Sequence, residues 1–539
     1  MHWKQVIDPF GNLWLSALIA VFPILFIFWA LIIKKIKGYQ VSLMSVVIAL
    51  LIAIFIYGMP AKLAFLSAAN GALYGLFPIC WLIIAAVFLF NLTVRSGKFE
   101  VIKHFMAGLT SDRRIQALLI AFSFGSFLEG TAGFGAPVAI TAAMLVGLGF
   151  NPLYAAGICL IANTAPVAFG SIGIPITVAS QVTNIPELAI SQMVGRTLPF
   201  LSLLLPFYLV MLMCGLRRTM EVLPAIIVTG VSFALLQWLT SNFMGPSLPD
   251  VFAGLGSIIA LFVLLRFWKP KSVWRFSNEP AAVSNTGVSY SSSEIFRAWS
   301  PFIILTVMVI CWGLQPVKEL LNELGQSQFE FPGLHNVIID GTGNGVAHVF
   351  KLNLLSAAGT AIFISALISI PVVGMSARES AGVFLATLKQ LRFPIITFAS
   401  VLAFAYLVND SGMTTTLAKG LANTGVLFPF FAPVLGWLGV FITGSDTSAN
   451  ALFGKLQAAT ATSIGVDPVV TVAANVSGGV VGKMISPQSI AVAAAAGGLI
   501  GKESDLFRFT VKHSFLMLIL ICLIVLAQAY LFKWMIPDY

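Results

Sequence analysis

Residues 115–150 read IQALLIAFSFGSFLEGTAGFGAPVAITAAMLVGLGF, a run of 36 residues whose single charged side chain is Glu129. A continuous helix of that length would reach about 54 Å, well beyond the roughly 30 Å hydrocarbon core of a bilayer. Glycine and proline interrupt the run in its middle, between Gly130 and Pro137. We therefore predict two half-helices that meet at a tip, a re-entrant hairpin, rather than one span.

The rest of the chain has the same apolar character. Of its 539 residues, 58% are hydrophobic and 9% are charged, and the mean hydropathy is +0.97. A soluble domain carries about 25% charged residues, so most of this surface faces lipid. The sequence has no series of short alternating strands, whereas its 46 glycines and 26 prolines are typical of membrane helices. The composition predicts an all-α polytopic membrane protein.

The charge, cysteine and histidine content excludes several other classes. The net charge of +10 is assigned to cytoplasmic loops, where Lys and Arg collect in membrane proteins, and not to a nucleic-acid surface. The five cysteines lie singly with no CxxC spacing, so neither a disulfide framework nor a metal site is expected. The five histidines fall in loops or at span ends, which argues against a haem or quinone enzyme. We expect no enzyme, no cofactor and no nucleic-acid partner.

About twelve spans and two hairpins account for the apolar runs. The spans are expected near 13–34, 41–57, 72–94, 152–181, 197–215, 223–242, 251–267, 300–315, 352–373, 394–408, 469–497 and 514–532, with hairpins at 115–150 and 427–464. Basic residues follow the first and third spans, so the positive-inside rule places both termini outside. The Ser-rich stretch 269–299 is predicted to be a flexible cytoplasmic loop, and 325–351 an external loop.

The second half of the chain repeats landmarks of the first. The offsets are 315, 314 and 312 residues for Ser96-Gly97 with Ser411-Gly412, Gly130 with Gly444, and Asn163 with Asn475. The spans 72–94 and 394–408 run in opposite directions, which predicts two inverted repeats with broken helices, the architecture of secondary transporters. The division is a first repeat at 1–215, linking helices and a loop at 216–299, and a second repeat at 300–539. The broken helices are 152–181 and 469–497.

Glu129 and Asp446 occupy matching positions at the two hairpin tips and are the candidates for proton coupling. An ionised carboxylate in hydrocarbon costs at least a few kcal/mol, so a carboxyl at this depth is usually functional or paired. A carboxyl that can become neutral is what a proton-coupled carrier needs. The alternatives are a hydrogen bond that caps the first tip, and a helix N-cap or a sodium ligand for one of the two residues.

The second break carries Lys483, a cation suited to an organic anion beside freed backbone N–H groups. An ion pair with Asp446 or Glu129 is the alternative. Polar residues at the tips and breaks, Ser171 and Ser477 among them, can bind a carboxylate and a hydroxyl, although each alone also suits unsatisfied backbone. With Lys483, the candidate substrate-binding residues are Thr131, Gly133, Asn163, Thr164, Ser445, Thr447, Ser448, Asn450, Asn475, Ser486 and Gln488. Arg196 and Asp410, at span ends, are weaker candidates that also fit simple interface charges.

Five stretches resemble the lactate permease family of bacterial proton symporters. They are FLEGTAGFGAPVAITA at 127–142, NTAPVAFG at 163–170, FITGSDTSANALF at 441–453, GKMISPQSIA at 482–491 and ESDLFRFTVKHS at 503–514. The resemblance covers nearly the whole chain. It implies a permease of the bacterial cytoplasmic membrane that takes up L-lactate, and often D-lactate and glycolate, with a proton.

The departures from the family are Thr131, where many members are expected to have Ala, and the loops 277–293 and 325–350, which do not align with it. The resemblance supplies no ligand positions, so the candidate site rests on the tips and breaks. A sodium-coupled carrier of dicarboxylates or other organic anions is the alternative function.

Overall fold

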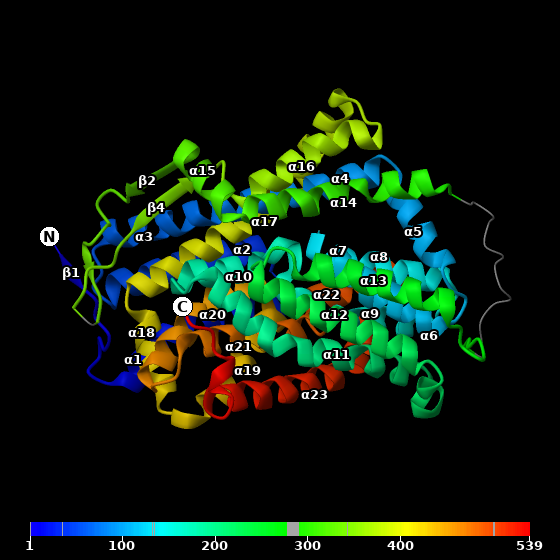
Figure 1. The fold of residues 1–539 in the computed structure, drawn as a ribbon. Coiled ribbons are helices and arrows are strands. Elements are labelled where there is room, and N and C mark those ends of the chain that lie inside the picture. The colour runs from blue at the N-terminus through cyan, green and yellow to red at the C-terminus, as the bar shows by residue number, and fades with distance from the viewer. Residues whose placement is uncertain are drawn as a thin grey trace.

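The structure, a computed structural model, describes residues 2–34, 36–131, 133, 135–276, 290–341, 343–499 and 502–539. Most of its helices run side by side across the molecule (Figure 1). Among the described residues, 11 helices are long and apolar enough to cross a membrane, or up to 12 when a bent pair is counted as one span. The prediction of an all-α polytopic membrane protein is confirmed.

The first half of the chain forms helices α1 to α13. Their bounds are α1 (Leu13–Phe28), α2 (Gly38–Phe55), α3 (Ala61–Tyr74), α4 (Trp81–Arg95), α5 (Lys98–Gly108), α6 (Arg113–Gln116), α7 (Gly125–Thr131), α8 (Ala136–Gly147), α9 (Pro152–Ala162), α10 (Gly170–Thr183), α11 (Glu187–Met220), α12 (Leu223–Phe243) and α13 (Pro249–Phe267). Wider π-type turns extend α1, join α3 to α4, and join α6 to α7.

The second half forms α14 to α23 and two small sheets. The helices are α14 (Ser292–Gly313), α15 (Gln315–Gly325), α16 (Ala358–Val373), α17 (Ala377–Asp410), α18 (Met413–Ala422), α19 (Phe428–Thr443), α20 (Asp446–Ser463), α21 (Pro468–Lys483), α22 (Pro487–Gly497) and α23 (Glu503–Tyr530). The strands are β1 (Trp3–Lys4), β2 (Gln326–Glu330), β3 (Ile338–Ile339) and β4 (Val349–Asn353). β1 pairs with β3 in parallel, and β2 with β4 antiparallel.

The loops and span ends differ from the sequence predictions. The expected external loop at 325–351 contains β2, β3 and most of β4, and α17 begins 17 residues before the expected span at 394–408. The physical reason for the second difference is that hydropathy detects only the part of a helix in hydrocarbon, whereas α17 continues into a polar segment capped by Ser376 and Glu379. Of the expected cytoplasmic loop, residues 277–289 lie outside the described residues, and α14 begins at Ser292.

Two helix interruptions occur where the sequence has glycine and proline. α9 and the helix that follows it are bent by 63°, and the backbone angle φ is positive at Ser171, Ile172 and Gly173, so residues 163–173 form the first break. Residues 484–486 between α21 and α22 form the second break. We call the turn between α7 and α8 (129–135, of which 132 and 134 lie outside the described residues) the first tip, and 443–448 between α19 and α20 the second tip.

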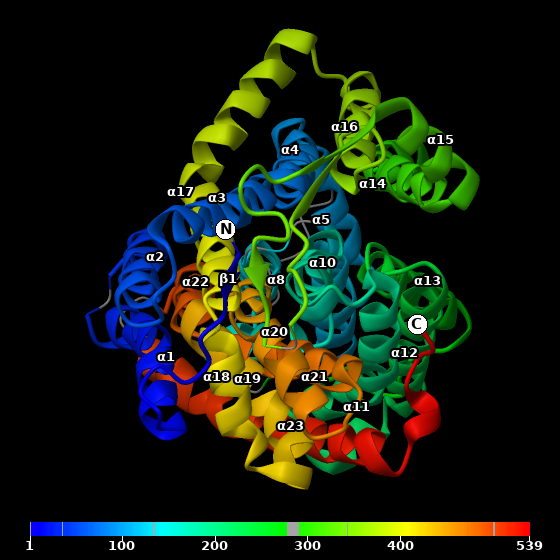
Figure 2. The ribbon, with the colours of Figure 1, turned by 90° about the vertical axis from the view of Figure 1, so that its left-hand side faces the viewer.

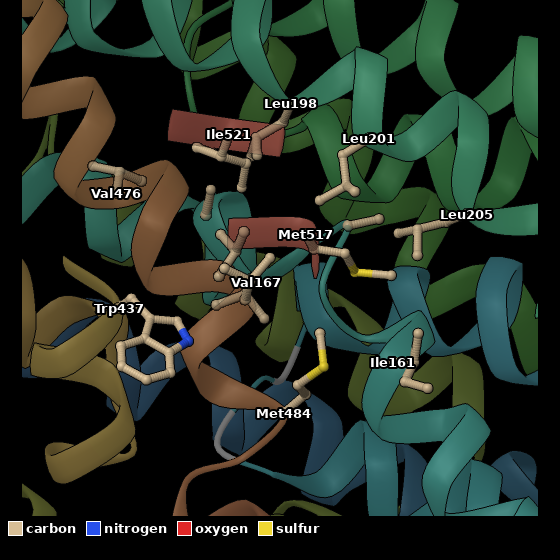
Figure 3. Close-up of a cluster of buried hydrophobic side chains, with 14 of the residues drawn as sticks. Ile161, Val167, Leu198, Leu201, Leu205, Trp437, Val476, Met484, Met517 and Ile521 are labelled. Carbon is tan, nitrogen blue, oxygen red and sulfur yellow. The ribbon is translucent and has the colours of Figure 1, made fainter. Parts of the chain in front are cut away.

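Helices from the two halves interlock around the breaks. Viewed from its left-hand end in Figure 2, the molecule has α10, α20 and α21 in its middle, with α1 to α3 on one side and α11 to α13 on the other. Figure 3 shows buried side chains of α9, α11, α19, α21 and α23 gathered in one apolar cluster. α19 and α21 pack so closely that a Cβ atom on Gly478 would collide with the backbone oxygen of Pro433. This packing buries irregular backbone in protein, as a membrane interior requires.

Candidate functional site

A cavity of about 470 Å³ lies where the two tips and the two breaks meet. Its volume is in the range of small-molecule binding sites. Both halves of the chain line it, and Tyr39 and Phe393, whose rings stack with centroids 4.6 Å apart, border it as well. Seven of the candidate residues line this cavity: Glu129, Ser445, Asp446, Thr447, Ser448, Lys483 and Gln488. Ser171, a polar residue that the sequence also places at the first break, lines it as well.

The first tip contributes a buried ion pair. Glu129 is 2% exposed, and its Oε1 lies 2.6 Å from the Nζ of Lys483. The Nδ2 of Asn163 donates to the other carboxylate oxygen at 3.0 Å. Both oxygens of Glu129 are therefore satisfied, by a cation from the second half of the chain and an amide from the first break. Of the two alternatives for Lys483, the structure shows the ion pair, and its partner is Glu129 rather than Asp446.

Local structure explains how these groups reach one another. A Cβ atom on Gly170 would lie 2.9 Å from Oε1 of Glu129, so only glycine leaves this space to the carboxylate. Lys483 is the last residue of α21, where the helix dipole favours a cation. The helix stops there because Pro487 begins α22, with Ser486 as its N-cap.

The second tip places Asp446 differently. It is 3% exposed, and neither of its carboxylate oxygens has a hydrogen-bond partner among the described residues. The N-cap of α20 is Ser445, whose hydroxyl accepts from the backbone N–H of Ser448 at 3.2 Å, so the N-cap alternative is wrong for Asp446. A Cβ atom on Gly479 would collide with Oδ1, which shows that the carboxyl packs directly against α21.

Two buried asparagines that do not line the cavity, Asn450 and Asn475, join the helices next to the breaks. The Nδ2 of Asn450 donates to the carbonyl oxygen of Pro175 at 3.1 Å, and the Nδ2 of Asn475 donates to Oδ1 of Asn450 at 2.9 Å. Asn475 also accepts from the Nε2 of Gln457 at 3.1 Å. These bonds connect α20 to α10 and α21, and the bond to Pro175 has the backbone-satisfying role considered for such residues.

Thr131 and Ser486 bond locally. The hydroxyl of Thr131 donates to the carbonyl oxygens of Phe127 and Leu128 at 3.1 and 3.2 Å, inside its own helix. Ser486 Oγ donates to Ser489 Oγ at 2.8 Å. The hydroxyl by which Thr131 departs from the family pattern is thus used by the helix backbone.

Gly133 and Thr164 lie close to the cavity without lining it. A Cβ atom on Gly133 would collide with the hydroxyl oxygen of Ser171, so the first tip rests on the first break. Thr164 is 1% exposed, and its hydroxyl lacks a hydrogen-bond partner within the described ranges.

The two weaker candidates lie away from the cavity. Arg196 donates through Nε to Oδ1 of Asn242 at 2.8 Å and through Nη1 to the carbonyl oxygen of Met535 at 2.7 Å. Asp410 is 5% exposed and therefore not a simple interface charge. Its Oδ2 lies 2.9 Å from Nε2 of His348 and also accepts from the hydroxyl of Ser67.

Sequence reasoning missed Asp250, in the first turn of α13. The residue is 1% exposed and interacts electrostatically with Glu129 and Lys483. In the sequence, Asp250 directly precedes the expected span 251–267, and charged residues are common at span ends. The packing of its side chain against Gly130, which buries it, is visible only in the structure. In the part of the chain that the structure describes, no group of three or more His, Cys, Asp or Glu side chains could hold a metal ion.

Comparisons with known proteins point to one family. A sequence model described as L-lactate permease matches residues 16–532. The L-lactate permease of Bacillus subtilis (strain 168) is 55% identical over 563 residues, which cover 100% of both chains. The glycolate permease GlcA of Escherichia coli (strain K12) is 52% identical over 557 residues, 99% of this chain and 100% of its own. Among solved structures, the Alcanivorax borkumensis YdaH transporter superposes with a TM-score of 0.49 at 14% identity, over 87% of this chain and 88% of that one.

Proposed function

This chain belongs to the L-lactate permease family, and we propose that it carries lactate and glycolate across the bacterial cytoplasmic membrane together with a proton. The observation that carries the proposal is the Lys483–Glu129 pair in the wall of a cavity shared by both tips. A 2-hydroxymonocarboxylate needs one cation and a few hydrogen-bonding groups, and this cavity offers both.

Coupling follows from competition for Lys483. A proton on Glu129 removes its negative charge and frees the ammonium group to bind the substrate carboxylate, so that anion and proton load together. When the proton leaves, Glu129 takes Lys483 back and the anion is released. The proton and the anion together carry no net charge, so the pH gradient drives their uptake.

Hydroxyl and amide groups around the cavity suit the rest of the substrate. The side chains of Ser445, Thr447, Ser448 and Gln488 line the wall beside Lys483. We assign them to the second carboxylate oxygen and the 2-hydroxyl. Asp446 lines the same wall and is the second candidate for proton binding.

Alternating access between two inverted repeats is the proposed transport movement. The first half lines the cavity with its tip and its break, and the second half with its tip and with Lys483 and Pro487, which flank its break. The turns that follow α4 and α17 are also alike. Each consists of a serine and a glycine with positive φ, which is 74° at Gly97 and 91° at Gly412. Tyr39 borders the cavity at one side. In the sequence it follows Lys34 and Lys37, two basic residues of an expected cytoplasmic loop.

The test is uptake of radiolabelled L-lactate into proteoliposomes with an imposed inward proton gradient. We expect accumulation by the wild type, a loss of about tenfold in Glu129→Gln, and preserved lactate exchange in the same variant. Asp446→Asn measures the second candidate, and Asp467→Asn, in the N-cap of α21, is the matched control. Uptake by the wild type that ignores the pH gradient and follows a sodium gradient would replace proton coupling with sodium coupling.

A further inference from the structure

Asp250 is a buried carboxyl that the mechanism above does not use. Neither of its oxygens has a hydrogen-bond partner in the described structure, and it is 1% exposed. An ionised carboxylate without a partner in such surroundings costs several kcal/mol, whereas a neutral carboxyl costs much less. A helix first turn favours an acidic residue, but that interaction is weak and does not require burial.

Close helix packing places Asp250 directly behind the first tip. A Cβ atom on Gly130 would lie 2.8 Å from Cβ of Asp250, and one on Gly254 would lie 2.7 Å from the backbone nitrogen of Phe127. α7 and α13 therefore touch along two turns without intervening side chains. The residue next to Glu129 in the chain is in contact with Asp250.

The surroundings of Asp250 are polar but closed. Ser126 stands one turn before Gly130 on the same face of α7, and its buried hydroxyl is without a hydrogen-bond partner among described residues. Asp250 does not belong to the cavity wall as described, so substrate does not reach it. Its electrostatic partners are Glu129 and Lys483, and the side chain of Gln237 on α12 faces it without a hydrogen bond of normal geometry.

Charge balance then assigns Asp250 a role. With Asp446, which also interacts electrostatically with Lys483, neutral in both states, Glu129, Asp250 and Lys483 are neutral together when they hold one proton. Binding an anion to Lys483 then restores neutrality only if these three groups take up a second proton. Either carboxyl can accept that proton, because either can pair electrostatically with Lys483 in the empty state. Asp446 lacks this symmetry, because it interacts electrostatically with Lys483 and not with Glu129.

We propose that Asp250 is a second proton-binding residue that shares the coupling proton with Glu129. The proposal rests on the proposed function. In each cycle one O–H bond forms on a carboxylate of the pair when the anion binds, with the proton supplied by water, and the same bond breaks when the anion leaves. With Glu129 removed, Asp250 ionises in the empty state and takes the proton in the loaded state.

The test compares Glu129→Gln, Glu129→Gln/Asp250→Asn and Glu129→Gln/Asp467→Asn in proteoliposomes. We expect the single variant to keep a residual accumulation driven by the pH gradient, and the Asp467 double variant to keep it as well. In the Asp250 double variant, this residual pH-driven accumulation should fall by about tenfold. Lactate should then cross as a net negative charge, driven by an inside-positive membrane potential.

Equal pH-driven accumulation in Glu129→Gln and its Asp250 double variant would overturn the proposal, and so would a complete loss of coupling in Glu129→Gln alone. A wild type that ignores the pH gradient would instead remove the proposed function. If the double variant does not fold, Asp250→Asn decides alone. Sharing predicts half-maximal uptake at a lower pH, because the pair that shares the proton loses one negative charge, whereas a structural role leaves the pH profile unchanged.

Discussion

The two tips present the same chemical group in two different states. Glu129 and Asp446 are both buried and both line the cavity, yet Glu129 is bonded to Lys483 and Asn163 while Asp446 lacks any hydrogen-bond partner in the ranges described. Asn475 in α21, which the sequence comparison of the two halves aligns with Asn163, bonds to Asn450 instead of to the carboxyl of its own half. Sequence position alone therefore does not fix the electrostatic state of a tip.

If the halves are aligned as the proposed inverted repeats, a single difference between them accounts for much of this contrast. Lys483 lies eight residues after Asn475, and the residue eight after Asn163 is Ser171. The chain thus has a cation at one break and a hydroxyl at the other, and the cation reaches across to the opposite tip. One carboxyl is neutralised by an ion pair, whereas the other can be neutralised only by a proton or by a ligand.

The largest effect is expected from removing the shared cation. Lys483→Met leaves Glu129 buried without its counter-charge and removes the group assigned to the substrate carboxylate. We expect lactate uptake to fall by roughly 100-fold or more. Adding Glu129→Gln should restore the folded yield but not uptake, as measured by size-exclusion profiles and proteoliposome assays. Recovered uptake in the double variant would contradict the role of Lys483 in binding.

Stability separates the two tips directly. Glu129→Gln removes the carboxylate that is bonded directly to Lys483 and is expected to lower the free energy of unfolding by about 3 kcal/mol. Asp446→Asn replaces a carboxyl that has no hydrogen-bond partner among the described residues, so no loss is expected. Thermal unfolding of both variants in the same detergent measures the contrast. Equal destabilisation of the two would mean that the tips are electrostatically alike.

A glycine beside Asp446 sharpens the comparison at the second tip. In Gly479→Ala the added methyl group collides with Oδ1 of Asp446 and must displace that side chain. We expect the apparent affinity for lactate to fall roughly tenfold. Gly382→Ala in α17, where nothing lies within 4 Å of the new Cβ atom, is the matched control. An unchanged affinity in Gly479→Ala would show that the position of Asp446 does not matter for binding.

The smallest effect concerns His348, which pairs with a carboxylate outside both tips. Burial lowers the pKa of His348, but its hydrogen bond and charge interaction with Asp410 outweigh burial and raise the pKa above the ordinary 6.5. The pair therefore adds stability that is fully present below pH 6.5 and is lost as the pH rises through the raised pKa.

His348→Gln should accordingly lower the unfolding temperature in acidic buffer and change it little in alkaline buffer. The pH profile of lactate accumulation should stay that of the wild type, because His348 lies outside the cavity lining. A shifted uptake profile would place part of the pH dependence at Asp410 rather than at the tips.

Most of the helical architecture could be predicted from the sequence. Runs of apolar residues located the spans, and glycine and proline located both breaks, because unpaired backbone in a membrane must be buried in protein. Helix ends were less accurate, since α11 and α17 each extend by ten residues or more beyond their apolar parts. Among the candidate residues, those at the second tip line the cavity, whereas Asn163, Asn450 and Asn475 hold the helices together.

The sequence by itself determined that this protein lies in a membrane, that it belongs to the lactate permease family, and that one carboxyl lies in each of two glycine-interrupted apolar runs. Those properties depend on composition and local pattern. The pairing of Lys483 with Glu129 over Asp446, the isolation of Asp446, and the burial of Asp250 behind Gly130 were decided only by the tertiary structure. Each depends on which helices meet, and residues 354 positions apart are brought to 2.6 Å only when the two halves interlock.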